Sequence, residues 1–285
     1  MGPRPQRRWV LAAAASLACA AALADAPRAT LVVCAPGSPG TTDEAQGAMD
    51  AFAAAVAAKA GLPAGSLAAI YEPGEDGGVA RLRAPDAAVA LVSLPFFLKH
   101  EKELVLRPEL QAVPQGGAGT ERWGLVARKG RVTGPAGLDG FTIYSTAGYA
   151  PAFVRGPALG GFGSLPPSVK IAQSSAVLSA LRRAVAGEPV AVLLDGAQQA
   201  ALPSLPFAAD LEVVTRSPPL PAGVVAPVNK RLPPARWAKV SAALRELPGE
   251  PAGAEALAGI RMTRFAPLDE PALAAARRAY AEASR

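Results

Sequence analysis

The chain has 285 residues, of which 51% are hydrophobic and 5% aromatic, and a formal net charge of +6 at pH 7. This length and apolar content indicate a globular protein with one large or two medium domains. The basic residues are scattered along the chain, and no run is long enough for a nucleic-acid patch, so we expect no nucleic-acid partner.

The first 26 residues have the layout of a secretory signal peptide. Three arginines within the first eight residues precede the apolar run 9–22, and small residues at 22–26 offer a cleavage site. The apolar run is too short for a transmembrane helix. We therefore expect export to the periplasm. A twin-arginine signal and a lipid anchor at Cys19 are alternatives for the route and for membrane attachment.

The first half of the mature chain alternates buried strands with a helix. The expected strands are residues 31–35, 67–71 and 87–92, and the expected helix is 43–60. Thr41 and Glu44 have the spacing of a capping box at the start of this helix. Cys34 lies in the first apolar run and is predicted to be a buried free thiol. This order of elements predicts an α/β fold.

The second half continues the pattern with more strands and ends in helices. The expected strands are 123–128, 141–144, 169–173, 190–194, 211–215 and 224–228. The expected helices are 176–186, 234–247, 252–258 and 270–283, and a further alanine-rich helix is expected directly after Ser145-Thr146.

Two connectors rich in Gly and Pro, at 114–119 and 217–223, bracket the middle of the chain. Two crossings of this kind predict two lobes joined by a hinge, with a mixed sheet flanked by helices in each lobe. We expect residues 1–26 to be the signal peptide, residues 27–117 and 220–285 to form lobe 1, and residues 118–219 to form lobe 2.

Three apolar runs within about fifty residues end in polar side chains: Ser145, Ser174 and Asp195. Ligands of open parallel sheets bind just outside the carboxyl ends of the strands. A helix starting after Ser145-Thr146 would add free backbone N–H groups and a positive dipole end. This pattern predicts a site for an anionic ligand without any formal positive charge.

Three segments resemble the solute-binding components of ABC importers for phosphate, phosphite or phosphonate. They are residues 137–149, with the sequence GLDGFTIYSTAGY, residues 177–195, and residues 229–269. The resemblance implies a type II periplasmic-binding-protein fold and an ABC permease as partner. It also implies that the hydroxyls of Ser145 and Thr146 and the N–H of Ala147 hold the oxyanion of the ligand, with Asp195 near the cleft.

Two departures from this family affect the expected ligand. Ser175 stands where family members have a histidine, and residues 93–97 lack the tyrosine that the first lobe usually offers. The resemblance therefore implies the fold and the general role but not specificity for phosphonates. Further ligand candidates are Ser174 and Ser175, Ser93, and Ser38 in the loop after the first strand. His100 is expected on the surface.

The sequence contains no arrangement typical of catalysis. The single histidine is not paired with a nucleophile, and no His, Cys and carboxylate cluster has metal-ligand spacing. We expect a monomeric binding protein for a small anionic solute, with no cofactor, no metal and no enzymatic activity, that contacts the membrane only through its permease or a lipid anchor. A sensor with the same fold and an enzyme that uses Cys34 are the alternatives.

Overall fold

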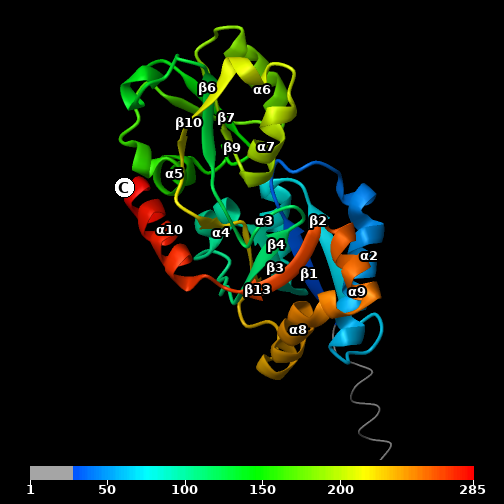
Figure 1. The fold of residues 1–285 in the computed structure, drawn as a ribbon. Coiled ribbons are helices and arrows are strands. Elements are labelled where there is room, and N and C mark those ends of the chain that lie inside the picture. Colours follow the sequence, from blue (N-terminus) through cyan, green and yellow to red (C-terminus); the bar gives the residue numbers. More distant parts are fainter. Residues whose placement is uncertain (1–27) are drawn as a thin grey trace, which may run out of the picture.

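The computed structural model describes residues 28–285, and these form two lobes that meet in the middle of the molecule (Figure 1). Each lobe has its own sheet, of six strands in one and of five in the other. The predicted two-lobed α/β architecture is confirmed. The expected signal peptide and Cys19 lie outside the described residues.

The six-stranded sheet of lobe 1 combines parallel and antiparallel pairs. Its strands, in spatial order, are β13 (Met262–Pro267), β4 (Leu110–Pro114), β12 (Gly223–Pro227), β3 (Ala87–Ser93), β1 (Ala29–Cys34) and β2 (Leu67–Glu72). The three strands β2, β1 and β3 run parallel, and the others are antiparallel to their neighbours. Sequence-distant segments therefore share one sheet.

Helices cover both faces of this sheet. The helices α2 (Thr42–Lys59), α8 (Pro234–Glu246) and α9 (Pro251–Gly259) pack on one face, and α3 (Glu75–Arg83) and α4 (Leu94–His100) pack on the other. Alternate residues of β1 belong to the two cores, with Val33 facing α2 and Cys34 facing α3 and α4. This explains why the strand is apolar throughout. The predicted capping box of Thr41 and Glu44 is present.

The five-stranded sheet of lobe 2 carries the predicted polar strand endings. Its order is β10 (Leu211–Arg216), β6 (Gly124–Arg128), β9 (Val190–Leu194), β7 (Thr142–Ser145) and β8 (Lys170–Gln173). The strands β9, β7 and β8 are parallel, so their carboxyl ends lie at one edge of the sheet. The helix α6 (Val177–Val185) packs against β9 and β6.

The helix predicted directly after Ser145-Thr146 is wrong. Residues 146–149 form a turn, and the short helices α5 (Pro151–Phe153), η2 (Val154–Ala158) and η3 (Gly160–Phe162) follow. Gly148 in this turn donates a backbone hydrogen bond to the carbonyl of Ser145. The carboxyl end of β7 is therefore a tight turn without the N-terminus of a regular helix.

The hinge consists of two short antiparallel strands, β5 (Thr120–Glu121) and β11 (Leu220–Pro221). Next to them, Ser217 is 1% exposed and binds Trp123 twice, through its backbone N–H and its hydroxyl oxygen. Both predicted connectors thus meet in one hydrogen-bonded ribbon. Such a ribbon can bend while keeping its pairing.

The C-terminal helix α10 (Glu270–Ala283) crosses from the sheet of lobe 1 to lobe 2 (Figure 1). It follows β13 and packs against α5 and η2. Its Arg277 pairs with Glu101 of lobe 1, with Nε 2.8 Å from Oε2. The exact lobe boundaries remain a prediction, because this helix contacts both lobes.

Candidate ligand-binding cleft

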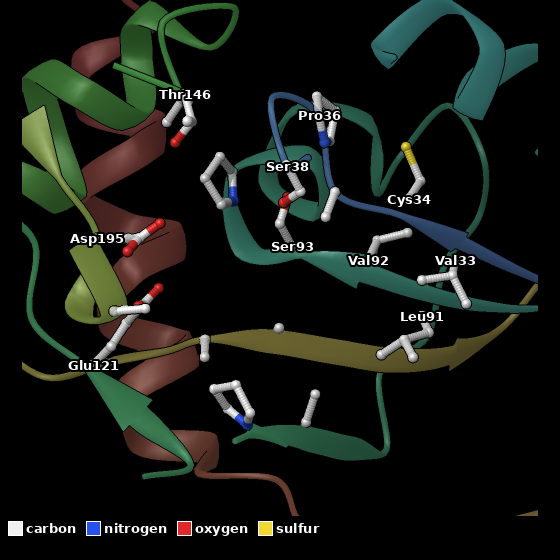
Figure 2. Close-up of a pocket in the computed structure, with 18 of the residues that line it drawn as sticks. Val33, Cys34, Pro36, Ser38, Leu91, Val92, Ser93, Glu121, Thr146 and Asp195 are labelled. Atoms are coloured by element: carbon white, nitrogen blue, oxygen red, sulfur yellow. The ribbon is translucent and has the colours of Figure 1, made fainter. Parts of the chain in front are cut away.

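A cavity of about 210 Å³ lies where the two lobes and the hinge meet. Lobe 1 lines it with the ends of β1 and β3 and with the loop after β1 (Figure 2). Lobe 2 contributes the turn after β7 and the first residues after β9, and the hinge contributes Glu121 and Trp123. The cavity therefore has a wall from each lobe and from the hinge.

Five of the eight predicted ligand residues line this cavity: Ser38, Ser93, Thr146, Ala147 and Asp195. Figure 2 shows the Thr146 hydroxyl and the Asp195 carboxylate on one side, opposite Ser38 and Ser93. The structure thus brings together residues that are up to 157 positions apart, between Ser38 and Asp195.

The other three predicted residues do not line the cavity. Ser145 is fully buried, and its hydroxyl donates to the Leu193 carbonyl at 2.9 Å. Its oxygen also accepts from the Ala147 N–H at 3.2 Å, so this N–H already has a partner. Ser174 and Ser175 follow β8 at the edge of the sheet. Of the predicted hydroxyls in lobe 2, only that of Thr146 therefore faces the cavity.

Asp195 follows β9 and forms the N-cap of α7 (Gly196–Ala201). Its Oδ1 accepts from the Gln198 N–H at 2.7 Å, and the Gln198 side chain accepts from the Asp195 N–H in return. Burial raises the pKa of this carboxyl above its ordinary value, although the cap hydrogen bonds oppose the shift. These hydrogen bonds therefore hold the Asp195 side chain in place at the lobe 2 wall of the cavity.

Glu121 is a second acidic group in the cleft, and the sequence analysis missed it. Its Oε2 accepts from the Gly196 N–H at 2.9 Å, next to Asp195. Burial, and then the negative charge of Asp195, raise the pKa of Glu121 to about 7. The signal that could have identified it is its place two residues before Trp123, between the Gly-rich connector and the predicted strand 123–128.

The glycine at position 196 permits this contact. A Cβ there would lie 3.0 Å from the Cβ of Glu121. Beside them, the Trp123 side chain is 4% exposed, and its indole N–H is buried without a hydrogen-bond partner among the described residues. This N–H is close enough to Glu121 to favour its carboxylate form. The hinge therefore contributes a carboxylate and an indole N–H donor at the same place.

The wall of the cleft has an acidic character. Glu121 and Asp195 are its only ionisable acids, and no Lys, Arg or His is among the described residues that line it. Figure 2 shows both carboxylates directed into the same space. Two carboxylates without a counter-ion repel a dianion and attract a cation or a hydrogen-bond donor.

The two lobes touch each other beside the cavity, so this is a closed arrangement. A Cβ at Gly37 of lobe 1 would lie 3.0 Å from Thr146 Cβ and 3.2 Å from its Cα. The Tyr149 hydroxyl of lobe 2 lies 3.3 Å from Ser93 Oγ. These contacts would have to separate for a ligand to enter.

His100 is not on the surface, so this expectation was wrong. It is 8% exposed, and its Nε2 lies 2.7 Å from Glu75 Oε1, while its Nδ1 lies 3.3 Å from Glu103 Oε2. The ring also packs against Phe96. A charged sequence neighbourhood suggested exposure, but α4 turns this side chain towards α3.

Cys34 is a buried free thiol, as predicted, and it lines the cavity. Burial, with smaller contributions from Glu72 and Glu75, raises its pKa far above the ordinary value. A thiol in this state is a poor nucleophile. Within residues 28–285, no group of three or more His, Cys, Asp or Glu could hold a metal ion, and no helix is long and apolar enough to cross a membrane.

No protein-family model matches the sequence, and no match is found among curated proteins. Solved structures do match. XAC2383 from Xanthomonas citri bound to ATP has a TM-score of 0.69 at 16% identity, over 90% of this chain and 98% of that chain.

Two further matches concern phosphonate binding. A binding protein component of an ABC phosphonate transporter from Pseudomonas aeruginosa has a TM-score of 0.63 at 15% identity, over 90% of this chain and 87% of that chain. PhnD1 from Prochlorococcus marinus in complex with methylphosphonate has a TM-score of 0.61 at 11% identity, over 90% and 98%. At these identities the likeness establishes the fold: the chain has the two-lobed fold of type II periplasmic binding proteins, with phosphonate-transporter binding components among its structural neighbours.

Proposed function

We propose that this protein is an exported solute-binding protein that closes its two lobes on a small ligand and delivers it to an ABC permease. The observation that carries the proposal is the cavity, which both lobes and the hinge enclose. The proposed export rests on the signal-like residues 1–26. The proposed permease rests on the structural neighbour from Pseudomonas aeruginosa, which is a component of such a transporter.

The ligand is a small solute, since the cavity holds about 210 Å³. An oxyanionic ligand is supported by the Thr146 hydroxyl and by the methylphosphonate bound to the Prochlorococcus marinus neighbour. Contacts from Ser145 and Ala147, which the sequence suggested, have less support because these groups are already paired with each other. Thr146 is therefore the proposed oxyanion contact.

A second candidate is a ligand that carries a positive charge, and the pair Glu121 and Asp195 favours it. Their carboxylates face the cavity, and none of the described residues that line it is Lys, Arg or His. A ligand with an ammonium group would restore the charge balance of the cleft. A ligand with both groups would satisfy Thr146 on one side and the carboxylates on the other.

Thermal unfolding of the mature protein with matched ligand pairs tests the role and the ligand charge together. The pairs are methylphosphonate with aminomethylphosphonate, and acetate with glycine, each of which differs by one ammonium group. A ligand at 100 times its dissociation constant adds about 2.7 kcal/mol to the free energy of unfolding. Stabilisation by any probe supports the binding role, and the member of each pair that binds more tightly decides the charge.

Variants separate the two ligand classes. Glu121→Gln removes the negative charge and keeps an acceptor for the Gly196 N–H, while Glu255→Gln makes the same change on the exposed face of α9. If a positive charge is recognised, Glu121→Gln weakens the ammonium-bearing probe about tenfold or more, and the control does not. An unchanged affinity of the ammonium-bearing probe for Glu121→Gln would favour the oxyanion alone. No stabilisation by any small solute would contradict the binding role.

The same site gives no support to an enzyme. Cys34 is the candidate nucleophile, and its burial holds it in the thiol form. We therefore propose a binding role without chemistry. Rapid alkylation of Cys34 by iodoacetamide in the folded protein would contradict this assignment.

A further inference from the structure

The end of α4 in lobe 1 carries two charged groups that reach across to the other side of the cleft. The Lys99 ammonium donates to the Tyr149 carbonyl of lobe 2 at 2.8 Å, and it lies 5.6 Å from the centre of the Tyr149 ring. Two positions later, Glu101 accepts from Arg277 of α10, which packs on lobe 2. Figure 1 shows α4 beside α10 and α5.

The position of Lys99 is held from within lobe 1. Its ammonium lies 2.6 Å from Glu75 Oε1, and the same oxygen lies 2.7 Å from His100 Nε2. Glu103 approaches the other ring nitrogen of His100. The cation is thus fixed in place before it meets lobe 2, so little side-chain freedom is lost when the lobes close.

The residue of lobe 2 that Lys99 contacts, Tyr149, is also held in a fixed position. Tyr149 lies in the turn after β7, and its hydroxyl lies 3.3 Å from Ser93 Oγ of lobe 1. Its burial between the lobes is strong enough to raise the pKa of the phenol well above its ordinary value. Tyr149 also lines the cavity. All of these contacts join protein groups of the two lobes.

We propose that Lys99, with Tyr149 as its receiver, is a latch that stabilises the closed arrangement of the lobes without a ligand, and that Glu101 and Arg277 reinforce it. On opening, Lys99 keeps its contact with Glu75 but loses the carbonyl and the ring of Tyr149. Ser93 then loses the Tyr149 hydroxyl. All contacts that differ between the open and the closed state are therefore made in the closed state. Such a difference shifts the equilibrium towards the closed state.

The latch makes two predictions about affinity and salt. The apparent dissociation constant equals the intrinsic constant divided by the closed fraction, so weakening the latch lowers affinity for every ligand by the same factor. Ligand preference stays unchanged. Lys99 is 33% exposed, so its interaction is screened by salt, and 1 M NaCl increases the open fraction.

The test measures the distance between the lobes in the ligand-free protein. Asp43→Cys at the start of α2 and Ala200→Cys in α7 place labels on exposed positions of the two lobes, and the native Cys34 is buried. Pulsed electron paramagnetic resonance or single-molecule energy transfer then gives the populations of open and closed forms. The protein is dialysed after partial unfolding so that no bound solute remains.

The informative variant is Lys99→Met, which keeps the aliphatic chain and removes the charge. Lys102→Met is the matched control, because Lys102 is exposed and lies three positions away. We expect a mostly closed wild type, and an open-to-closed ratio that rises about fivefold or more in Lys99→Met and less in Glu101→Gln. Tyr149→Phe, which keeps the ring and the carbonyl, should have the smallest effect.

Two results would overturn the latch. One is a ligand-free wild type that is almost entirely open, and the other is a Lys99→Met variant with the same populations as Lys102→Met. Circular dichroism confirms that each variant is folded. Because no ligand is used, the result is independent of the proposed transport role, and failure of either leaves the other standing.

Discussion

The two walls of the cleft differ in chemistry. Lobe 1 offers apolar side chains and the hydroxyls of Ser38 and Ser93, whereas lobe 2 and the hinge offer both carboxylates, Asp195 and Glu121. The difference follows in part from the residues that end the strands behind each wall. Strand β3 of lobe 1 ends at Ser93, the N-cap of α4, whereas β9 of lobe 2 is followed by Asp195, the N-cap of α7. Serine and aspartate are both favoured at an N-cap, but only aspartate brings a negative charge.

This comparison suggests a division of roles between the lobes. In the proposed binding role, lobe 2 and the hinge would select the charge of the ligand, and lobe 1 would supply shape and the closing contacts through Gly37, Ser93 and Lys99. Substitutions in lobe 2 should then change ligand preference, and substitutions in lobe 1 should change closure. The following predictions test this division from the largest expected effect to the smallest.

Phe153→Ala should cost about 3–5 kcal/mol in the free energy of unfolding. Phe153 is fully buried in lobe 2 and makes an edge contact with Trp123, with ring centroids 5.0 Å apart. Urea unfolding measures the cost, with the partly buried Phe162→Ala as control. A loss below 1 kcal/mol for Phe153→Ala would show that the stability of lobe 2, which carries the acidic wall, does not depend on the packing of Phe153.

The pH dependence of stability should report Glu121. Because its pKa is about 7 in the folded protein and lower in the unfolded chain, the free energy of unfolding falls as the pH rises from about 4.5 to 7. The decrease is of the order of 2 kcal/mol after allowance for solvent screening. Urea unfolding at pH 5, 6, 7 and 8 should give a smaller decrease for Glu121→Gln. Equal pH profiles for the wild type and Glu121→Gln would show that Glu121 does not cause this decrease.

Gly37→Ala should impair closure more than it impairs folding. The φ of Gly37 is +86°, and the new Cβ would meet Thr146 across the cleft. Gly40→Ala is the control, since Gly40 has a φ of +102° but no atom of lobe 2 near it. Both variants should lose about 1–2 kcal/mol of stability from backbone strain. Only Gly37→Ala should also open the lobes, as seen by the label distance, and equal opening in both would contradict the contact.

Ser93→Ala should have the smallest effect. Its hydrogen bond to Tyr149 is 3.3 Å long and lies at the side of the cavity. We expect a change in the free energy of unfolding of about 0.5 kcal/mol and a small rise in the open fraction. Ligand preference within each matched pair should not change. A reversed ligand preference would show that lobe 1 also contributes to the selection of ligand charge.

Much of the fold could be predicted because its signals are local. The apolar runs that form β1, β7 and β9 are bounded by turn residues, and α10 was predicted with the bounds that the structure has. The elements that the sequence did not predict are short, or have an apolar face that can be recognised only from its tertiary contacts. β5 and β11 have two residues each and exist only because they pair with each other.

The candidate site could be predicted only in part. Thr146 and Asp195, which were predicted because they follow apolar strands, do line the cavity, since the parallel order of the strands brings their ends together. Ser145 follows the same rule, but the alternation of a strand turns its side chain into the lobe, where Leu193 accepts its hydrogen bond. Sequence position alone does not distinguish these two neighbours.

By itself, the sequence determined the α/β class, the two connectors and the polar endings of the strands, because these depend on apolar periodicity and turn-forming residues. Only the tertiary structure decided the charge of the cleft and the way it closes. Glu121 acquires its role from the pairing of two hinge strands 99 positions apart, Glu121 with Leu220. Lys99 acquires its role from a carbonyl in the opposite lobe. Electrostatic interactions depend on distance in space and on burial, and neither is encoded in any single stretch of the chain.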